Sequence, residues 1–131
     1  MTSSGSPDRF AVVAGAIRLA SGVSFLIAPE AANVLWGGDP DDVGPTTSLL
    51  LRSMGYRDAL IGALLLTAGL RGEATAGWFL ASAGADLADL TGGLANNDRL
   101  TDTAKRRGDG GAAVGIAVGI LGAARAWRRR R

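Results

Sequence analysis

The chain contains no cysteine and no histidine among its 131 residues. Disulfide bonds, thiolate chemistry, iron–sulfur clusters and histidine-based zinc or haem sites are therefore excluded. Any acid–base chemistry would have to use carboxylates or the single tyrosine, Tyr56. The sequence predicts no cofactor and no metal.

Large aromatic side chains are also scarce: the chain has three Phe, three Trp and one Tyr beside 20 glycines. Small residues are typical of helices that approach closely in lipid, where there is no need for a bulky core. Apolar runs of about 18 residues or more are hard to bury in one small soluble domain. The composition therefore predicts a single all-α domain in the cell membrane.

Four apolar segments predict a four-helix transmembrane bundle within one domain, residues 8–127. The first helix is expected at residues 8–28, because Pro29 disfavours helix at the residue before it. This segment has no basic leader and holds Arg18 at its centre, so a retained helix is favoured over a signal peptide. The other three helices are expected at residues 46–70, 74–95 and 111–127.

The segments between and beyond these helices are polar. Residues 1–7 are expected to form a disordered leader, and residues 30–45 and 96–110 hydrophilic loops. Arg71-Gly72-Glu73 predicts a tight turn. Residues 128–131, all arginine, predict a basic cytoplasmic tail. No basic surface interleaved with aromatics accompanies the tail, so it is expected to touch lipid headgroups and not nucleic acid.

The distribution of Lys and Arg outside the predicted spans favours a multi-pass orientation with both termini in the cytoplasm. The side that holds the termini carries seven basic residues, and the other side carries four. Basic residues prefer the cytoplasmic side. The run Lys105-Arg106-Arg107 lies on the other side and is an exception to this rule.

Six charged residues, three basic and three acidic, lie inside the predicted spans. One unpaired charge at mid-bilayer costs about 2.5–3.5 kcal/mol on insertion scales. Because the six charges sum to zero, they are expected to neutralise one another in an interior Arg/Asp cluster. The six residues are Arg18, Arg52, Arg57, Asp58, Asp86 and Asp89.

One expected arrangement pairs Asp58 with Arg18, and pairs Arg52 or Arg57 with the two later aspartates. Asp86 and Asp89 are three residues apart on one helical stripe, and they would repel each other if both were ionised. An arginine between them would remove this repulsion.

The sequence leaves two interpretations of the cluster open. It is either a structural clamp that holds the helices in register or a site, because ionisable residues inside a membrane usually mark a ligand, ion or proton path. As a site, it would bind a small amphipathic or anionic ligand within the membrane, in an accessory subunit or a homo-oligomer. The ligand-binding residues would then be Arg18, Arg52, Arg57, Trp78 and Ser82.

A second functional interpretation is a cofactor-independent membrane cyclase, isomerase or epoxide-opening enzyme with a lipophilic substrate. Its acid or base would be Asp86 or Asp89, while Arg57 or Tyr56 polarises an oxygen atom. Asp58 completes the set of candidate catalytic residues. Tyr56 also has a plainer interpretation as a packed aromatic. The Asp86-x-x-Asp89 pair has no second Asp-rich motif beside it and does not predict a Mg²⁺ site.

A third interpretation is purely structural and rests on the glycine ridge of the last helix. Gly111, Gly115, Gly119 and Gly122 form a smooth ridge that would pack tightly against a neighbour. The ridge from Gly111 to Gly119 is therefore a predicted contact for a homo-oligomer or a larger membrane complex.

Several motifs together resemble a known type of protein. They are Arg18-x-x-x-Gly22, Pro29, Trp36-Gly37 and Arg52-x-x-Gly55-x-Arg57-Asp58-x-x-x-Gly62. The pattern is similar to small bacterial four-helix integral membrane proteins, of an actinobacterial and fungal type that forms a family of unknown function, and distantly to DoxX-like membrane proteins. The resemblance covers the first three helices and implies a four-helix bundle with an interior Arg/Asp cluster. It implies no activity, and a redox-partner role would rest on the DoxX likeness alone.

Overall fold

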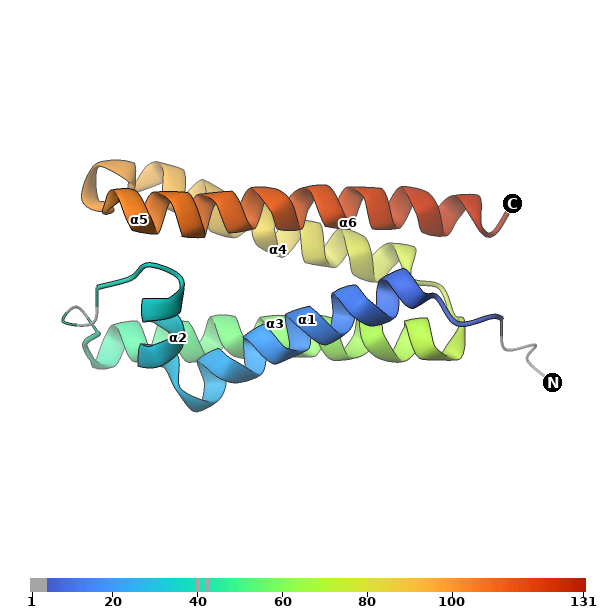
Figure 1. Ribbon diagram of the computed structural model, residues 1–131, viewed down its shortest axis with the longest axis horizontal. Coiled ribbons are helices and arrows are strands. Elements are labelled where there is room, and N and C mark those ends of the chain that lie inside the picture. Colours follow the sequence, from blue (N-terminus) through green and yellow to red (C-terminus); the bar gives the residue numbers. More distant parts are fainter. Residues whose placement is uncertain (1–4, 40, 42) are drawn as a thin grey trace.

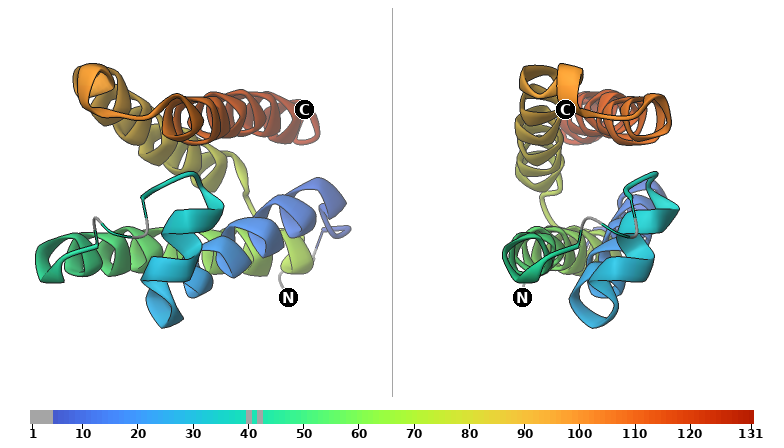
Figure 2. Two further views of the ribbon diagram at one scale, coloured as in Figure 1. Left: turned by 60° about the vertical axis from the view of Figure 1, so that its left-hand side comes forward. Right: turned by 90° about the vertical axis from the view of Figure 1, so that its left-hand side faces the viewer.

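The computed structural model describes residues 5–39, 41 and 43–131. Every regular element in these residues is a helix, so the all-α prediction is confirmed. The long helices are α1 (Arg9–Ile27), α3 (Pro45–Arg71), α4 (Ala76–Ala95) and α6 (Gly110–Arg128). In Figure 1, α1 and α3 form one antiparallel pair and α4 and α6 form a second pair alongside it. Seen end-on, α4 lies over α3 and α6 over α1 (Figure 2, right).

The ends of the first two long helices follow from local chemistry. Asp8 caps α1, because its Oδ1 accepts hydrogen bonds from the backbone N–H groups of Phe10 (3.1 Å) and Ala11 (3.3 Å). Gly72 ends α3 with φ +65°, a left-handed conformation that glycine adopts without strain. The predicted turn at Gly72 is therefore confirmed. Part of the predicted leader, residues 1–4, lies outside the described residues.

Two segments predicted as loops contain helix. The short helix α2 (Pro29–Leu35) begins directly after Ala28. Pro29 ends α1 as expected, but it also starts α2, because the first helical position tolerates the missing N–H and matches the fixed φ of proline. The prediction of a loop is therefore wrong for residues 30–35.

The segment before α6 is also largely helical. A 3-10 turn (Asn97–Arg99) and α5 (Asp102–Ala104) are followed by a π-helical turn (Lys105–Asp109) that runs into α6. The Thr101 hydroxyl caps this helix by accepting a hydrogen bond from the N–H of Ala104 (3.2 Å). The predicted loop is wrong for residues 102–110, because the helix continues beyond its apolar part to this polar cap.

Glycines set the close approach within the first helix pair, α1 and α3. Gly15 lies against the backbone of Gly62 and Leu66, and Gly22 lies against that of Gly55 and Ala59. A Cβ atom at Gly15 or Gly22 would overlap these backbones, so the two helices can pack this closely only with glycine there.

In the second helix pair, α4 and α6, the predicted glycine ridge faces the same chain. Gly119 and Gly122 lie against Phe79, and Gly115 lies against the carboxylate of Asp86. Gly111 lies against the ring of Trp36. A partner that used this ridge would have to displace these contacts.

The two pairs meet in a small apolar core. Ala11, Leu65, Phe79 and Ala123 contribute one side chain from each long helix, and each is at most 1% exposed. Ala14 and Trp78 pack against them. Phe10 on α1 adds a tilted aromatic contact with Phe79, with ring centroids 5.5 Å apart.

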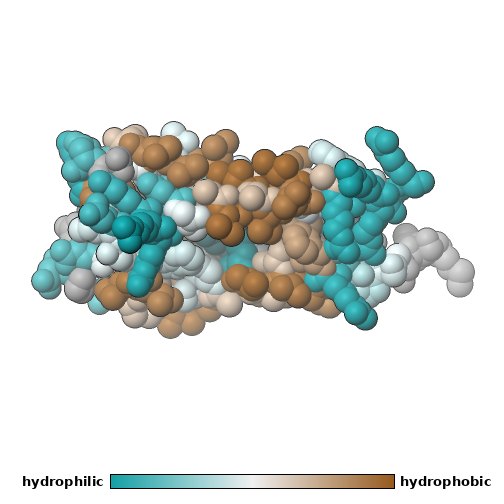
Figure 3. All heavy atoms as spheres, turned by 45° about the horizontal axis from the view of Figure 1, so that its top comes forward, coloured by the Kyte–Doolittle hydropathy of each residue, from teal (hydrophilic) through white to brown (hydrophobic). Residues whose placement is uncertain are grey.

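The surface carries most of the large apolar side chains. Residues such as Val13, Ile17, Leu60, Leu87 and Leu121 are exposed. On the face that Figure 3 shows, this apolar surface forms a belt across the middle of the molecule, with hydrophilic ends. Two helical stretches, Arg9–Ile27 and Asp102–Arg128, are long and apolar enough to cross a membrane.

Candidate functional site

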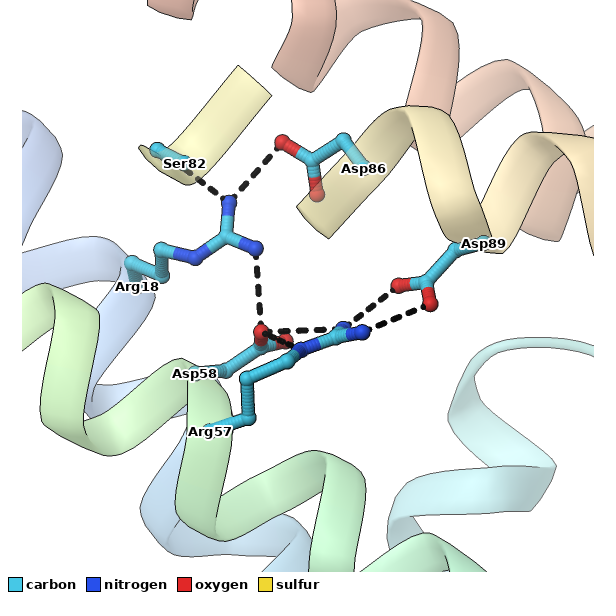
Figure 4. Close-up of polar contacts among 6 residues, drawn as sticks. All are labelled: Arg18, Arg57, Asp58, Ser82, Asp86 and Asp89. Carbon is cyan, nitrogen blue, oxygen red and sulfur yellow. Dashed lines mark hydrogen bonds and ion pairs between the residues drawn. The ribbon is translucent and has the colours of Figure 1, made fainter. Parts of the chain in front are cut away.

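The candidate site is a network of charged side chains between the two helix pairs (Figure 4). Arg18 of α1 and Arg57 and Asp58 of α3 meet Asp86 and Asp89 of α4. We call these five residues, with Ser82, the Arg/Asp network. It contains five of the six charges predicted to lie together.

The glycine spacing of the first helix pair places two of these residues opposite each other. Arg18 lies three residues after Gly15 and four before Gly22, and Asp58 has the same spacing between Gly55 and Gly62. Residues at these separations share one helix face. Because Gly15 packs on Gly62 and Gly22 on Gly55 in the antiparallel pair, Arg18 must face Asp58.

Arg18 forms the buried half of the network. Its Nη2 donates to Asp58 Oδ1 (2.9 Å), and its Nη1 donates to Asp86 Oδ2 (2.8 Å) and Ser82 Oγ (2.7 Å). The side chains of Arg18, Asp58 and Asp86 are only 12–14% exposed. Arg18 Nε is buried and has no hydrogen-bond partner among the described residues. One guanidinium thus connects α1 to both α3 and α4.

Arg57 forms the more open half. It binds Asp89 with two parallel hydrogen bonds, Nη1 to Oδ1 (3.0 Å) and Nη2 to Oδ2 (2.8 Å). Its Nε also donates to Asp58 Oδ1 (3.1 Å). The side chains of Arg57 and Asp89 are 34% and 36% exposed. Two-pronged contacts of this kind fix direction as well as distance, so α3 and α4 are held in register.

Each of the later aspartates has its own arginine. Asp86 binds Arg18 and Asp89 binds Arg57, so the repulsion expected between the two carboxylates is compensated. The expected pairs of Asp58 with Arg18 and of Arg57 with Asp89 are both present. Asp86 differs from the expected arrangement, because it pairs with α1 and not with α3.

Arg52 and Tyr56 lie outside the network, which corrects their prediction as pocket residues. Arg52 is exposed and donates to the carbonyl oxygen of Leu26 (2.9 Å), and Tyr56 is 62% exposed. A residue two positions from Asp58 points about 200° away from it on an ideal helix, so Tyr56 faces outward. Trp78 also lies elsewhere, against the apolar core.

Without Arg52, the charges of the network do not cancel. Two arginines face three aspartates, which leaves one negative charge in excess when all five groups are ionised. The predicted zero sum is therefore wrong for the network. Chemically, such a site suits a bound group that donates hydrogen bonds, a cation or a proton. No group of three or more metal-ligating side chains occurs in the part of the chain that the structure describes.

A second charged cluster was not predicted. Asp8 is buried at the end of the molecule where α6 finishes, and its Oδ1 lies 3.1 Å from both Arg125 Nη1 and Arg129 Nη1. The hydroxyl of Thr75 also donates to Asp8 Oδ2 (3.5 Å). Because the number of long helices is even, the first and the last helix bring both chain ends to the same end of the molecule. The acidic cap Asp8 and the basic tail were therefore the features of the sequence from which this cluster could have been predicted.

The match to known proteins covers the network and most of the four long helices. The model of a family described as "Domain of unknown function (DUF4267)" matches residues 15–124. The chain belongs to this family. The predicted membership of a family of unknown function is thereby confirmed, and the DoxX likeness stays a prediction. No curated protein and no solved structure matches this DUF4267 chain.

Proposed function

We propose that this DUF4267 protein is a multi-pass membrane protein that binds a small amphipathic ligand at the Arg/Asp network. All four long helices would cross the bilayer, with both termini in the cytoplasm. The excess carboxylate of the network is the observation that carries the ligand proposal.

The membrane part of the proposal is supported by the distribution of side chains. Glycine, alanine and charged groups lie between the helices, while leucine, isoleucine and valine face outward. In water this surface would favour aggregation, whereas lipid solvates it. The two helices that are apolar enough by themselves to cross a membrane do not include α3 or α4, since each of these carries charges of the network. Mutual neutralisation lowers the cost of placing these charges in lipid.

The ligand part is supported by the position and charge of the network. It lies between two separately packed helix pairs, and hydrophilic atoms are visible in the recess between two apolar bands in Figure 3. Both arginines are already engaged by aspartates. This arrangement favours a ligand whose polar end donates hydrogen bonds or is positively charged over an anionic one. Its apolar part would lie against the surrounding lipid.

The test is native mass spectrometry of protein extracted gently from its own membrane. We would compare wild type with Arg57→Ala and Asp86→Asn, and use Arg52→Ala as the matched control outside the network. A small molecule retained by wild type and Arg52→Ala, and lost from both network variants, is the expected result. Equal retention by all four proteins would contradict the proposal.

A structural clamp is the second candidate. It is favoured by the single guanidinium of Arg18, which joins α1, α3 and α4. In this case no sample would hold a ligand, and the network variants would lose their fold. An enzyme acting on a lipophilic substrate stays a prediction, and the exposed Tyr56 leaves only the network carboxylates as its acid or base.

A further inference from the structure

An apolar groove lies at the opposite end of the molecule from the termini. It is formed by the end of α2 and the start of α6, with a volume of about 540 Å³. Trp36 forms one wall, because its ring lies against Gly111. The lining residues are Leu35, Trp36, Arg107, Gly110, Gly111 and Val114, and we call this feature the Trp36 groove.

One side of the Trp36 groove is basic. Arg107 is exposed and is held at the groove by a hydrogen bond from its Nη1 to the carbonyl oxygen of Leu35 (2.9 Å). Arg106, next to it, is also exposed. Among the residues that the structure describes, neither arginine has a carboxylate within ion-pair distance. Lys105 differs, because it has a long ion pair with Asp102 (3.9 Å).

We propose that the Trp36 groove binds one anionic phospholipid, with an acyl chain along the groove and the phosphate at Arg107. The inference rests on the membrane part of the proposed function, but not on a ligand at the Arg/Asp network. An apolar channel beside a basic side chain is complementary to a molecule that joins a hydrocarbon chain to a phosphate. Arginine suits this role because its planar fork matches phosphate oxygens.

The position of the groove supports a lipid. Figure 1 places α2 and α5 at one end of the molecule, beyond the middle part of the long helices, and Figure 3 shows hydrophilic surface at both ends of the apolar belt. Headgroups would lie at this level, and tryptophan favours the same depth. The run Lys105-Arg106-Arg107 would then serve lipid binding, which explains basic residues on the side where topology alone does not require them.

The experiment uses the full chain reconstituted in vesicles of mixed phosphatidylglycerol and phosphatidylcholine. After extraction, native mass spectrometry counts the lipids of each kind that stay bound. Wild type should retain one phosphatidylglycerol in preference to phosphatidylcholine. Arg107→Gln should reduce this preference about fivefold, since one basic residue near a membrane contributes about 1 kcal/mol. Arg99→Gln removes an arginine at the same end but outside the groove, and it should keep the preference.

A second variant keeps the test independent of Arg107. Val114→Glu places a carboxylate at an exposed position in the groove, and it should expel the anionic lipid while the helix content stays unchanged. Glycerol phosphate, which has the phosphate without the chains, should not displace the lipid.

Three results would overturn the inference: no preference in wild type, an equal loss in Arg99→Gln and Arg107→Gln, or displacement by glycerol phosphate. A failure of the wild-type chain to enter vesicles at all would instead count against the membrane part of the proposed function.

Discussion

Asp58 is the residue on which both arginines of the network converge. Its Oδ1 accepts from Arg18 Nη2 and from Arg57 Nε. The side chain is 14% exposed, so water can replace little of what these contacts provide. Removal of the charge leaves each arginine with one carboxylate partner, Asp86 for Arg18 and Asp89 for Arg57.

We therefore expect Asp58→Asn to lower the free energy of unfolding by about 1.5–3 kcal/mol, the contribution of a hydrogen bond to a charged group, because both arginines keep a carboxylate partner. Unfolding by a denaturing detergent, followed by circular dichroism in mixed micelles, would measure it. Asp102→Asn is the control, because the side chain of Asp102 is 94% exposed. A loss as small as that of Asp102→Asn would mean that the network contributes little to stability.

The pair of Arg57 and Asp89 separates stability from binding. Arg57→Met alone leaves the carboxylate of Asp89 without its partner. The double variant Arg57→Met with Asp89→Leu removes both charges, so it should be more stable than the single variant by about 1–3 kcal/mol, because no carboxylate is left without its partner. The same detergent unfolding would measure the difference.

Ligand retention in the double variant then distinguishes the two candidate functions. A stable double variant that has lost the small molecule is expected if the network is a binding site. If the double variant were less stable than Arg57→Met, the unpaired carboxylate of Asp89 would not be what destabilises the single variant.

At the residue scale, the sequence predicted the Arg18–Asp58 contact from the need of each charge for a partner, and the matching glycine spacings of α1 and α3 explain why it forms. It did not predict that Arg57, besides its expected partner Asp89, would also contact its neighbour Asp58, since a long flexible side chain is not placed by helix periodicity. Arg52 was predicted to join the cluster because it lies inside the second apolar segment. The 100° step between helix positions is the better guide, and it separates Arg52 and Tyr56 from Asp58.

At the scale of helices, the close packing of α1 against α3 depends on glycines, which have no side chain at the contact. A Cβ atom at Gly22 would overlap the backbone of Ala59 and Gly55. Gly22→Ala should therefore lower stability by about 1–3 kcal/mol, as over-packing does elsewhere. Gly84 on α4 is the matched control, because a Cβ atom there would meet nothing within 4 Å. Gly84→Ala should be neutral or stabilising by up to about 1 kcal/mol.

Detergent unfolding of both variants tests this contrast. If Gly22→Ala were as stable as Gly84→Ala, the close approach of α1 and α3 would be wrong.

Helix positions in the apolar segments were predictable, whereas the polar connections were not. The four apolar runs gave bounds close to those of the long helices. Hydropathy cannot detect α2 or the helical turns that precede α6, residues 102–109, because both segments lie in polar sequence. Their signals were local: Pro29 at a first helical position, and Thr101 as a cap in front of Ala104.

At the scale of the whole molecule, Asp8 connects the beginning of the chain to its end through Arg125 and Arg129. Asp8→Ala should free the end of α6, so that trypsin cleaves the terminal arginines several-fold faster. Timed proteolysis with mass analysis of the released C-terminus would measure the rate. Glu73→Gln changes an exposed acid at the same end and should leave the rate unchanged. No acceleration in Asp8→Ala would mean that the contact does not hold the tail.

The proposed orientation is directly testable because the chain has no cysteine of its own. Asp98→Cys and Arg131→Cys place single thiols at opposite ends of the molecule. In intact cells a membrane-impermeant thiol reagent should label only Asp98→Cys, whereas both should react after the membrane is opened. Labelling of Arg131→Cys alone in intact cells would show that the orientation is the opposite one. Labelling of both variants in intact cells would contradict a chain embedded in the membrane.

The division of the network between two helix pairs has a consequence for how the chain is made. The first pair carries two arginines and one aspartate of the network, and the second pair carries the remaining two aspartates. In the proposed membrane topology, the first hairpin would enter the bilayer during synthesis with a surplus positive charge from the network, and the second would follow with two negative charges. Each half would carry uncompensated charge in lipid until it meets the other, so electrostatic attraction would favour the docking of the two halves.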